Sequence, residues 1–169
     1  TPGHDLEYAN LTYNLTGATF ANSDVSFALF ASSSASLSSA TFTNAIITGA
    51  NFSGMTARGF INTQLYSTAS YATNNLSGIN LSSDTLSSWN FANQNLSNAN
   101  LSNATFTSAT LTNASLANAT ISGAEFTSTT GLGFTAAQLY STANYLAGDL
   151  TGVGFAFDDL TAWNFANIN

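Results

Sequence analysis

Large apolar residues recur at every fifth position through the middle of this chain. Between residues 74 and 128 these central positions are Leu76, Leu81, Leu86, Phe91, Leu96, Leu101, Phe106, Leu111, Leu116, Ile121 and Phe126. Alanine stands two residues before the later members, from Ala99 to Ala124, and mostly Ser, Thr, Asn or Gly follows each one. A period of five matches neither the 3.6-residue turn of a helix nor the alternation of a flat strand. This stretch must therefore fold into something other than ordinary helices or strands.

A period of five fits a square coil in which each side is five residues long. Every side then points one large and one small residue toward the axis and keeps polar residues outside. Coils stacked at the spacing of paired strands, roughly 4.8 Å, would give about eight coils and a rod of roughly 35–40 Å. The pattern predicts an all-β solenoid that forms one domain over residues 1–169.

The step Ala99-Asn100-Leu101-Ser102-Asn103 shows the repeated motif in full. It resembles the pentapeptide-repeat proteins, whose consensus is A-[D/N]-L-x-x, and the resemblance extends over nearly the whole chain. The resemblance implies a right-handed quadrilateral β-helix. The chain departs from the family pattern before the central residue, where Asn and Thr stand in place of most Asp residues.

The N-terminal part follows the same rule with changes of phase. The Ser-rich stretch 31–36 separates two series that are out of step by two residues, and we expect it to form a bulged corner or a short loop. The first series contains Leu6, Leu11, Phe20, Val25 and Phe30, and the second contains Leu37, Phe42, Ile47 and Phe52.

A longer repeat is superimposed on the short one. The hexapeptide Gln64–Ala69 recurs unchanged at Gln138–Ala143, and about half of the residues are identical between 64–95 and 138–169. We interpret this as an internal duplication of 22–95 and 96–169, each copy carrying a helical insertion, at about 61–72 and 135–146. The combination resembles secreted bacterial pentapeptide proteins with a Q-L-Y-S-T-x-x-Y insertion.

Each insertion is predicted to be one short helix. Thr135 and Gln138 have the spacing of a capping box, and Asn62 or Thr63 is expected to cap the first copy. We expect the helices to pack against a corner of the rod through Leu65, Tyr66 and Tyr71 and through Leu139, Tyr140 and Tyr145.

Asp and Trp replace alanine just after each insertion, as Asp84 with Trp89 and Asp158 with Trp163. An Asp paired with a Trp is able to bind a cation or a sugar. The alternative is that the coil is wider there, so that Trp fills the gap and Asp accepts hydrogen bonds from corner amides. The packing alternative is favoured.

Charge and cysteine content exclude several kinds of function. Charged residues make up 5% of the chain, the net charge is −7, and Arg58 is the only strong base, so binding to nucleic acid or to an anionic membrane is not expected. The absence of cysteine excludes disulfides and zinc–sulfur sites. No apolar run is long enough for a membrane span.

The sequence predicts no catalytic residues, no cofactor and no metal site. His4-Asp5-x-Glu7 is better explained as a solvated end than as part of a metal site. Asp158 and Asp159 are adjacent, but neighbouring residues of a β-coil face opposite ways, so they should not act as an acid–base pair. His4 is the only histidine, which leaves the hydroxyl groups without an activating base.

Ten N-x-S/T sequons invite the alternative of glycosylation in a secreted protein. The repeat itself generates such sequons, because Asn precedes the central residue and Ser or Thr follows it, and this explanation is favoured. The asparagines are Asn10, Asn14, Asn51, Asn75, Asn80, Asn95, Asn100, Asn103, Asn113 and Asn118.

The two ends carry the leading functional hypothesis. Residues 1–8 are a candidate N-terminal cap, whereas residues 163–169 are in full repeat register with no comparable cap. We expect head-to-tail stacking into an extracellular fibre or sheath; counting in fives from Phe165 into a following copy reaches Thr1, Leu6 and Leu11. The chain begins at Thr1 rather than Met, so an excised or processed segment is the competing explanation.

Two further functions are alternatives to self-assembly. A DNA-mimicking inhibitor of topoisomerases needs a dense row of carboxylates, and Asn stands at those positions here. An ice-binding or polysaccharide-binding module needs regular ranks of hydroxyls, but Thr105 is expected to stack under Glu125 and Thr112 beside Ala92. We therefore rank both below a non-enzymatic structural role.

Overall fold

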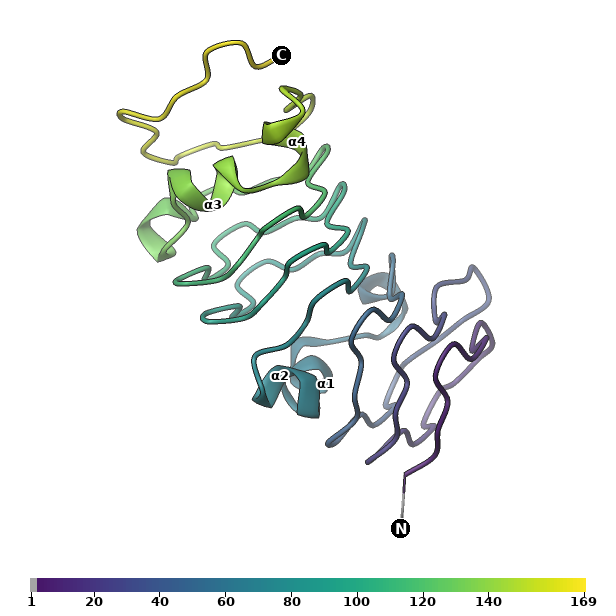
Figure 1. Ribbon diagram of the computed structural model, residues 1–169. Coiled ribbons are helices and arrows are strands. Elements are labelled where there is room, and N and C mark those ends of the chain that lie inside the picture. The colour runs from purple at the N-terminus through teal and green to yellow at the C-terminus, as the bar shows by residue number, and fades with distance from the viewer. Residues whose placement is uncertain (1–2) are drawn as a thin grey trace.

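The computed structural model describes residues 3–169 as a rod of stacked coils (Figure 1). The first coils, in purple, and the last coil, in yellow, lie at opposite ends of the rod. Successive coils are joined by isolated parallel bridges such as Asn80↔Asn100 and Asn100↔Thr120. The chain is thus a β-solenoid in which every backbone ladder runs between consecutive coils. Thr1, the first of the three residues reached by counting in fives, and Pro2 of the candidate cap lie outside the described residues.

One five-residue step accounts for most of the fold. The N–H of Ala104 donates to the C=O of Leu101 at 3.1 Å, which closes a turn around the left-handed Asn103, whose φ is 56°. Asn tolerates this conformation, which most side chains disfavour. Asn100 Oδ1 also accepts the N–H of Ser102 at 3.1 Å. Asn before the central residue therefore forms the corner hydrogen bond that an Asp acceptor would otherwise form.

The core runs along the axis and contains the predicted residues. All eleven central residues from Leu76 to Phe126 are buried, and so are the alanines from Ala99 to Ala124. Aromatic rings stack between neighbouring coils, as in Phe30 on Phe52 at 4.7 Å and Phe106 on Phe126 at 5.1 Å between ring centroids. The solenoid and its inward-facing positions follow from the five-residue period.

Coil length varies where the sequence changes phase. Bridged residues are 20 apart over most of the C-terminal half, but 22 apart across the Ser-rich stretch, as in Asp24↔Ile46. The two extra residues form the turn at Ser33–Ser34, which agrees with the predicted short loop. The first coil is one residue short, with Asp5↔Asp24 19 apart, because Leu15 follows Leu11 after four residues. The sequence analysis did not assign Leu15 to the core series.

Each insertion lengthens one coil to 29 residues, as in Asn51↔Asn80 and Glu125↔Gly154. The prediction of a single helix in each insertion was wrong. Each contains two short α-helices that meet at a Ser-Thr pair, where the extended Thr68 and Thr142 cap the second helix. The elements are η1 (Thr56–Arg58), α1 (Asn62–Tyr66), α2 (Ala69–Ala72), η2 (Thr130–Leu132), α3 (Ala136–Tyr140) and α4 (Ala143–Leu146). None of these helices is long and apolar enough to cross a membrane.

The predicted cap of the first copy was also wrong. Thr135 caps α3 and accepts the N–H of Gln138, as predicted for a capping box. In the first copy Ile61 occupies the cap position, and neither Asn62 nor Thr63 caps α1. Gln64 Oε1 still accepts the N–H of Ile61 at 2.8 Å. Half of the capping box is enough here because the helix is also held by the preceding coil.

Candidate functional site

The insertion is fixed to the preceding coil by its glutamine. Gln64 Nε2 donates to the C=O groups of Leu37 and Ala40, both at 2.8 Å. Gln138 repeats this arrangement with Leu111 at 2.7 Å and Ala114 at 2.9 Å. These carbonyls lie at the coil edge where the helices replace a regular side. The glutamine therefore supplies a donor to the C=O of Ala40 or Ala114 and a second donor to the C=O of Leu37 or Leu111, which already accepts a turn N–H.

Two tyrosines fix the insertion to the following coil. The Tyr66 hydroxyl accepts the N–H of Asn90 at 2.6 Å, and the Tyr71 hydroxyl donates to its C=O at 2.9 Å. Tyr140 and Tyr145 hold Asn164 in the same way, with the Tyr145 bond at 2.7 Å. Each tyrosine pair thus supplies one donor and one acceptor to a residue whose usual ladder partner is displaced. Burial, and then the nearby Tyr66, raises the pKa of Tyr71.

Asp84 and Asp158 hold the start of each insertion. Asp84 Oδ1 accepts the N–H of Thr56 at 2.8 Å, and Asp158 Oδ1 accepts the N–H groups of Thr129 at 2.6 Å and Thr130 at 2.8 Å. The second carboxylate oxygen of each Asp is buried without a partner. Burial raises the pKa of Asp84 to about 7, although hydrogen bonds from Thr56 and its neighbours oppose the shift. These contacts are those expected for the packing alternative.

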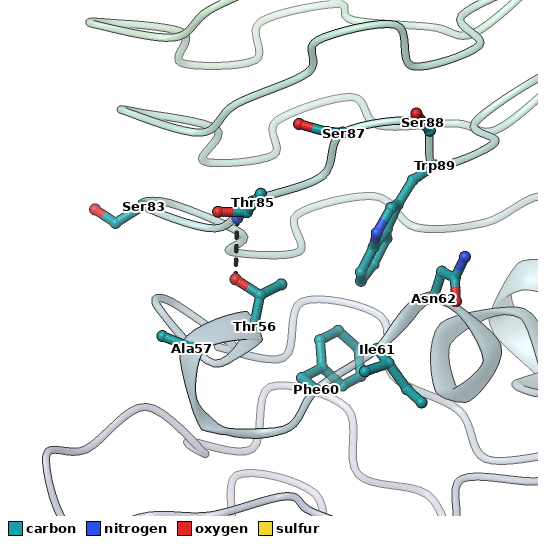
Figure 2. Close-up of a pocket in the computed structure, with 10 residues that line it drawn as sticks. All are labelled: Thr56, Ala57, Phe60, Ile61, Asn62, Ser83, Thr85, Ser87, Ser88 and Trp89. Atoms are coloured by element: carbon teal, nitrogen blue, oxygen red, sulfur yellow. Dashed lines mark hydrogen bonds between the residues drawn. The ribbon is translucent and has the colours of Figure 1, made fainter.

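Trp89 lies beside a groove between the first insertion and the next coil (Figure 2). Its indole packs near Phe60, at 6.0 Å between ring centroids, and near Tyr66, at 6.4 Å, and is only 7% exposed. The groove has a volume of about 400 Å³, and Thr56 Oγ1 accepts the N–H of Thr85 across it at 2.9 Å. Asp84 is not among the lining residues. The Asp and Trp therefore do not line a common cavity, and the groove wall is formed mainly by hydroxyls and neutral side chains.

The remaining chemical candidates stay apart. Within residues 3–169 no cluster of three His, Asp or Glu side chains is close enough to hold a metal ion, and this includes His4, Asp5 and Glu7. Asp5 Oδ1 instead accepts the N–H of Glu7 at 3.2 Å. Asp158 is half-buried, whereas Asp159 is exposed and accepts the N–H of Thr161. The adjacent acids therefore hold two different corners.

Large apolar side chains are exposed near both ends of the rod, and also at Ile46, Ile61, Leu132 and Leu146. Tyr8, Tyr13 and Phe27 are exposed near the N-terminal end, and Phe157 and Phe165 on the last coil. Leu6, Leu11, Trp163 and Ile168 are only partly buried against the core. Trp89 and Gln94, the residues of the first copy equivalent to Trp163 and Ile168, are buried. The most exposed of these side chains, Phe157, Tyr13 and Tyr8, lie on these two end surfaces.

Three features of these surfaces and of the insertions escaped the sequence analysis. The hydrogen bonds of the tyrosine hydroxyls could not be predicted, because they depend on which backbone groups the side chains reach in the folded chain. Buried Gln94 occupies an alanine position, and its Nε2 donates to the C=O of Tyr71 and to Asn74 Oδ1. The aromatic residues at left-handed corners, Tyr8, Phe27 and Phe157, had a visible signal: each stands two residues after a central position, where Asn, Ser or Gly is usual.

Comparisons with known proteins give the family. The family model described as pentapeptide repeats (8 copies) matches residues 35–59, 75–113 and 86–123. No curated sequence matches the chain.

Among solved structures, a trypsin-treated QnrB1, a plasmid-mediated fluoroquinolone resistance protein, is similar at 20% identity and a TM-score of 0.41, covering 90% of this chain and 67% of the other. A pentapeptide repeat protein of the Arabidopsis thaliana thylakoid lumen is similar at 22% identity and a TM-score of 0.30, covering 90% of this chain and 83% of the other. HetL, a pentapeptide repeat protein involved in heterocyst differentiation regulation in Nostoc sp. strain PCC 7120, is similar at 17% identity and a TM-score of 0.29, covering 92% of this chain and 84% of the other. These low values support no inference about function. By these repeats, residues 35–59 and 75–123 belong to the pentapeptide-repeat family.

Proposed function

We propose that this chain is a non-enzymatic structural protein that assembles head to tail into an extracellular fibre or sheath. The observation that carries the proposal is the exposure of apolar side chains on both end coils. Phe91 of the first copy is completely buried, whereas the equivalent Phe165 on the last coil is 37% exposed. Covering such surface is favourable by about 25 cal/mol per Å².

The backbone of the last coil also favours a second copy of the chain as its partner. In interior coils, N–H groups such as that of Leu101 donate to the next coil, here to Thr120 at 2.8 Å. The N–H groups of Phe155 and Phe157 on the last coil have no backbone acceptor within residues 3–169. A second copy in the same orientation offers matching carbonyls. Such a heterologous contact propagates as a filament unless its rotation closes.

The polar sides suit an assembled rod. The sides carry hydroxyls and amides with few charges, so neighbouring rods repel one another weakly. We infer a right-handed quadrilateral coil and an extracellular or cell-surface location from the resemblance to secreted members of the family. Glycans on the sequon asparagines belong to the same proposal, since several of them, including Asn75 and Asn113, are exposed.

Sedimentation velocity tests the proposal with the purified chain over a dilution series. We expect the weight-average sedimentation coefficient to rise with concentration, and to rise further with added salt, because the net charge of −7 opposes association. A single monomeric boundary at all concentrations and salt levels would contradict head-to-tail assembly.

A second candidate is a module that binds polysaccharide, and the groove beside Trp89 favours it. The hydroxyls of Ser83, Thr85 and Ser87 and the edge of an indole line this groove. Glycan-array binding that is lost on Ser87→Trp, a change that fills the groove, would support this function. Equal binding by both proteins would place any such site elsewhere.

A further inference from the structure

Three corner residues have side chains that do not suit their backbone. A positive φ recurs two positions after most central residues, and 14 of the 18 non-glycine residues with a positive φ are Asn or Ser. Three of the others are aromatic: Tyr8 at 59°, Phe27 at 57° and Phe157 at 60°. Bulky residues in this region are strained, and such strain clusters at functional positions. The three aromatic corners therefore need an explanation beyond local conformation.

Two of these aromatics already form a stack. The rings of Tyr8 and Phe27 lie 5.0 Å apart at an angle of 10°, on successive coils. Phe27 in turn lies over Gly49, where an added Cβ would fall 2.4 Å from its ring. One face of the Tyr8 ring is thus covered by Phe27, while its other face points toward the N-terminal end of the rod. Tyr8 is 69% exposed.

Phe157 is the third aromatic corner, on the last coil. It is 92% exposed, and the corner of the preceding coil is Ser128, which has no ring to stack on it. Within residues 3–169, the ring of Phe157 therefore has no aromatic partner at the corner of the preceding coil.

We propose that the junction between copies has one register, in which Phe157 of one copy lies one coil before Tyr8 of the next and extends the stack to Phe157–Tyr8–Phe27. This inference rests on the head-to-tail assembly proposed above and names the contact that fixes it. A square coil allows four registers related by quarter turns. Tyr13 is the other exposed aromatic of the first coil, but its φ is not positive and no ring stacks on it. The Tyr8 register alone continues an existing column.

The same register completes the backbone ladder. Interior coils follow one rule: Leu101 donates to Thr120, Asn103 donates to Ser122, and Thr120 donates back to Ala99. Applied across the junction, the rule directs the N–H of Phe155 to the C=O of Asp5 and the N–H of Phe157 to the C=O of Glu7. Asp5 and Glu7 then face Gly154 and Ala156, so neither of these acids faces another acid.

Disulfide trapping tests the register, because the chain contains no cysteine. Glu7 and Ala156 are exposed, and each follows a central residue. In the proposed register their backbones lie at the strand spacing of about 5 Å, within the range that a disulfide bridges. The double variant Glu7→Cys with Ala156→Cys should form a ladder of disulfide-linked oligomers under mild oxidant.

Matched controls place the first cysteine on the other described sides of the first coil. Thr12 follows Leu11 and Thr16 follows Leu15, just as Glu7 follows Leu6. Ala156→Cys combined with Thr12→Cys or Thr16→Cys should give no ladder. A ladder from either control, without one from the Glu7 pair, would overturn the register and leave head-to-tail assembly standing. No ladder from any pair, together with a monomeric boundary in sedimentation, would overturn both.

The substitution Phe157→Asn provides an independent readout. Asn suits the left-handed corner and Phe157 is exposed, so the isolated chain should fold and melt at the same or a higher temperature. Loss of the ring pair should weaken association about threefold to tenfold. Unchanged association would overturn the role of the aromatic column.

Discussion

The two copies of the insertion carry the same residues in two different settings. The first copy lies inside the rod, where Asp84 is 1% exposed and Phe91 is fully buried, whereas the equivalent Asp158 and Phe165 belong to the last coil and remain partly open. The hydrogen bonds of Gln64 and Gln138 to the preceding coil are nonetheless the same. A coil is therefore anchored by the coil before it, but its core is closed only by the coil after it.

The largest difference in stability between the two copies is expected when the equivalent phenylalanine ring is removed from each. Phe91→Ala should lower the free energy of unfolding by about 3–5 kcal/mol, because it leaves a cavity in a closed core. Phe165→Ala should lower it by only about 1 kcal/mol in the monomer, since the ring is partly exposed. Urea denaturation of dilute protein measures both. Equal losses would show that the following coil is not what closes the core.

A pH titration tests the interior carboxyl. The pKa of Asp84 is raised to about 7, above its value in the unfolded chain. Its contribution to stability is therefore fully present below about pH 4 and is lost as the pH rises through 7, with a loss of up to about 4 kcal/mol. Asp84→Asn, which stays neutral, should flatten this part of the stability profile. A profile that keeps its slope would contradict the assignment.

Asp149 contrasts with Asp84 because its pKa is lowered, so its contribution to stability depends on pH in the opposite direction. Hydrogen bonds from the Thr151 side chain and backbone lower its pKa. Its contribution is present at neutral pH and is lost as the pH falls through the lowered pKa. Asp149→Asn should therefore change only the acidic end of the profile.

The glutamine anchors should behave alike in the two copies. Gln64→Ala leaves the C=O of Ala40 without its donor, and Gln138→Ala does the same to Ala114, whereas the C=O groups of Leu37 and Leu111 keep a turn hydrogen bond. We expect each change to lower stability by about 1–2 kcal/mol. Thermal or urea unfolding compares them directly. A much smaller effect for Gln138 would mean that anchoring, too, depends on the following coil.

Removal of the tyrosine hydroxyls should give the smallest change in stability. Tyr66→Phe removes the acceptor of the Asn90 N–H and should cost about 1 kcal/mol. Tyr140→Phe should cost about as much, because Asn90 and Asn164 are both exposed and water replaces the lost acceptor in each case. Amide hydrogen exchange at Asn90 and Asn164 reports on each bond, and we expect faster exchange at Asn90 in Tyr66→Phe and at Asn164 in Tyr140→Phe.

The regular part of this fold could be predicted because each step is a local rule. Leu, Ala, Asn and the corner residue of one pentapeptide decide its conformation almost independently, so Leu101 and Ala104 could be placed without a structure. The short step to Leu15, the break at Ser67–Thr68 and the cap at Ile61 depend on contacts with neighbouring coils. The partnerless oxygen of Asp84 and the bonds to Asn90 depend on coils brought together only by folding.

The most direct test of the central claim is electron microscopy of the purified chain across a dilution series. We predict unbranched filaments at high concentration, and we expect these filaments to shorten on dilution. Their axial repeat should be near one subunit length, about 35–40 Å at the spacing of paired strands. Dispersed short rods at every concentration would contradict it.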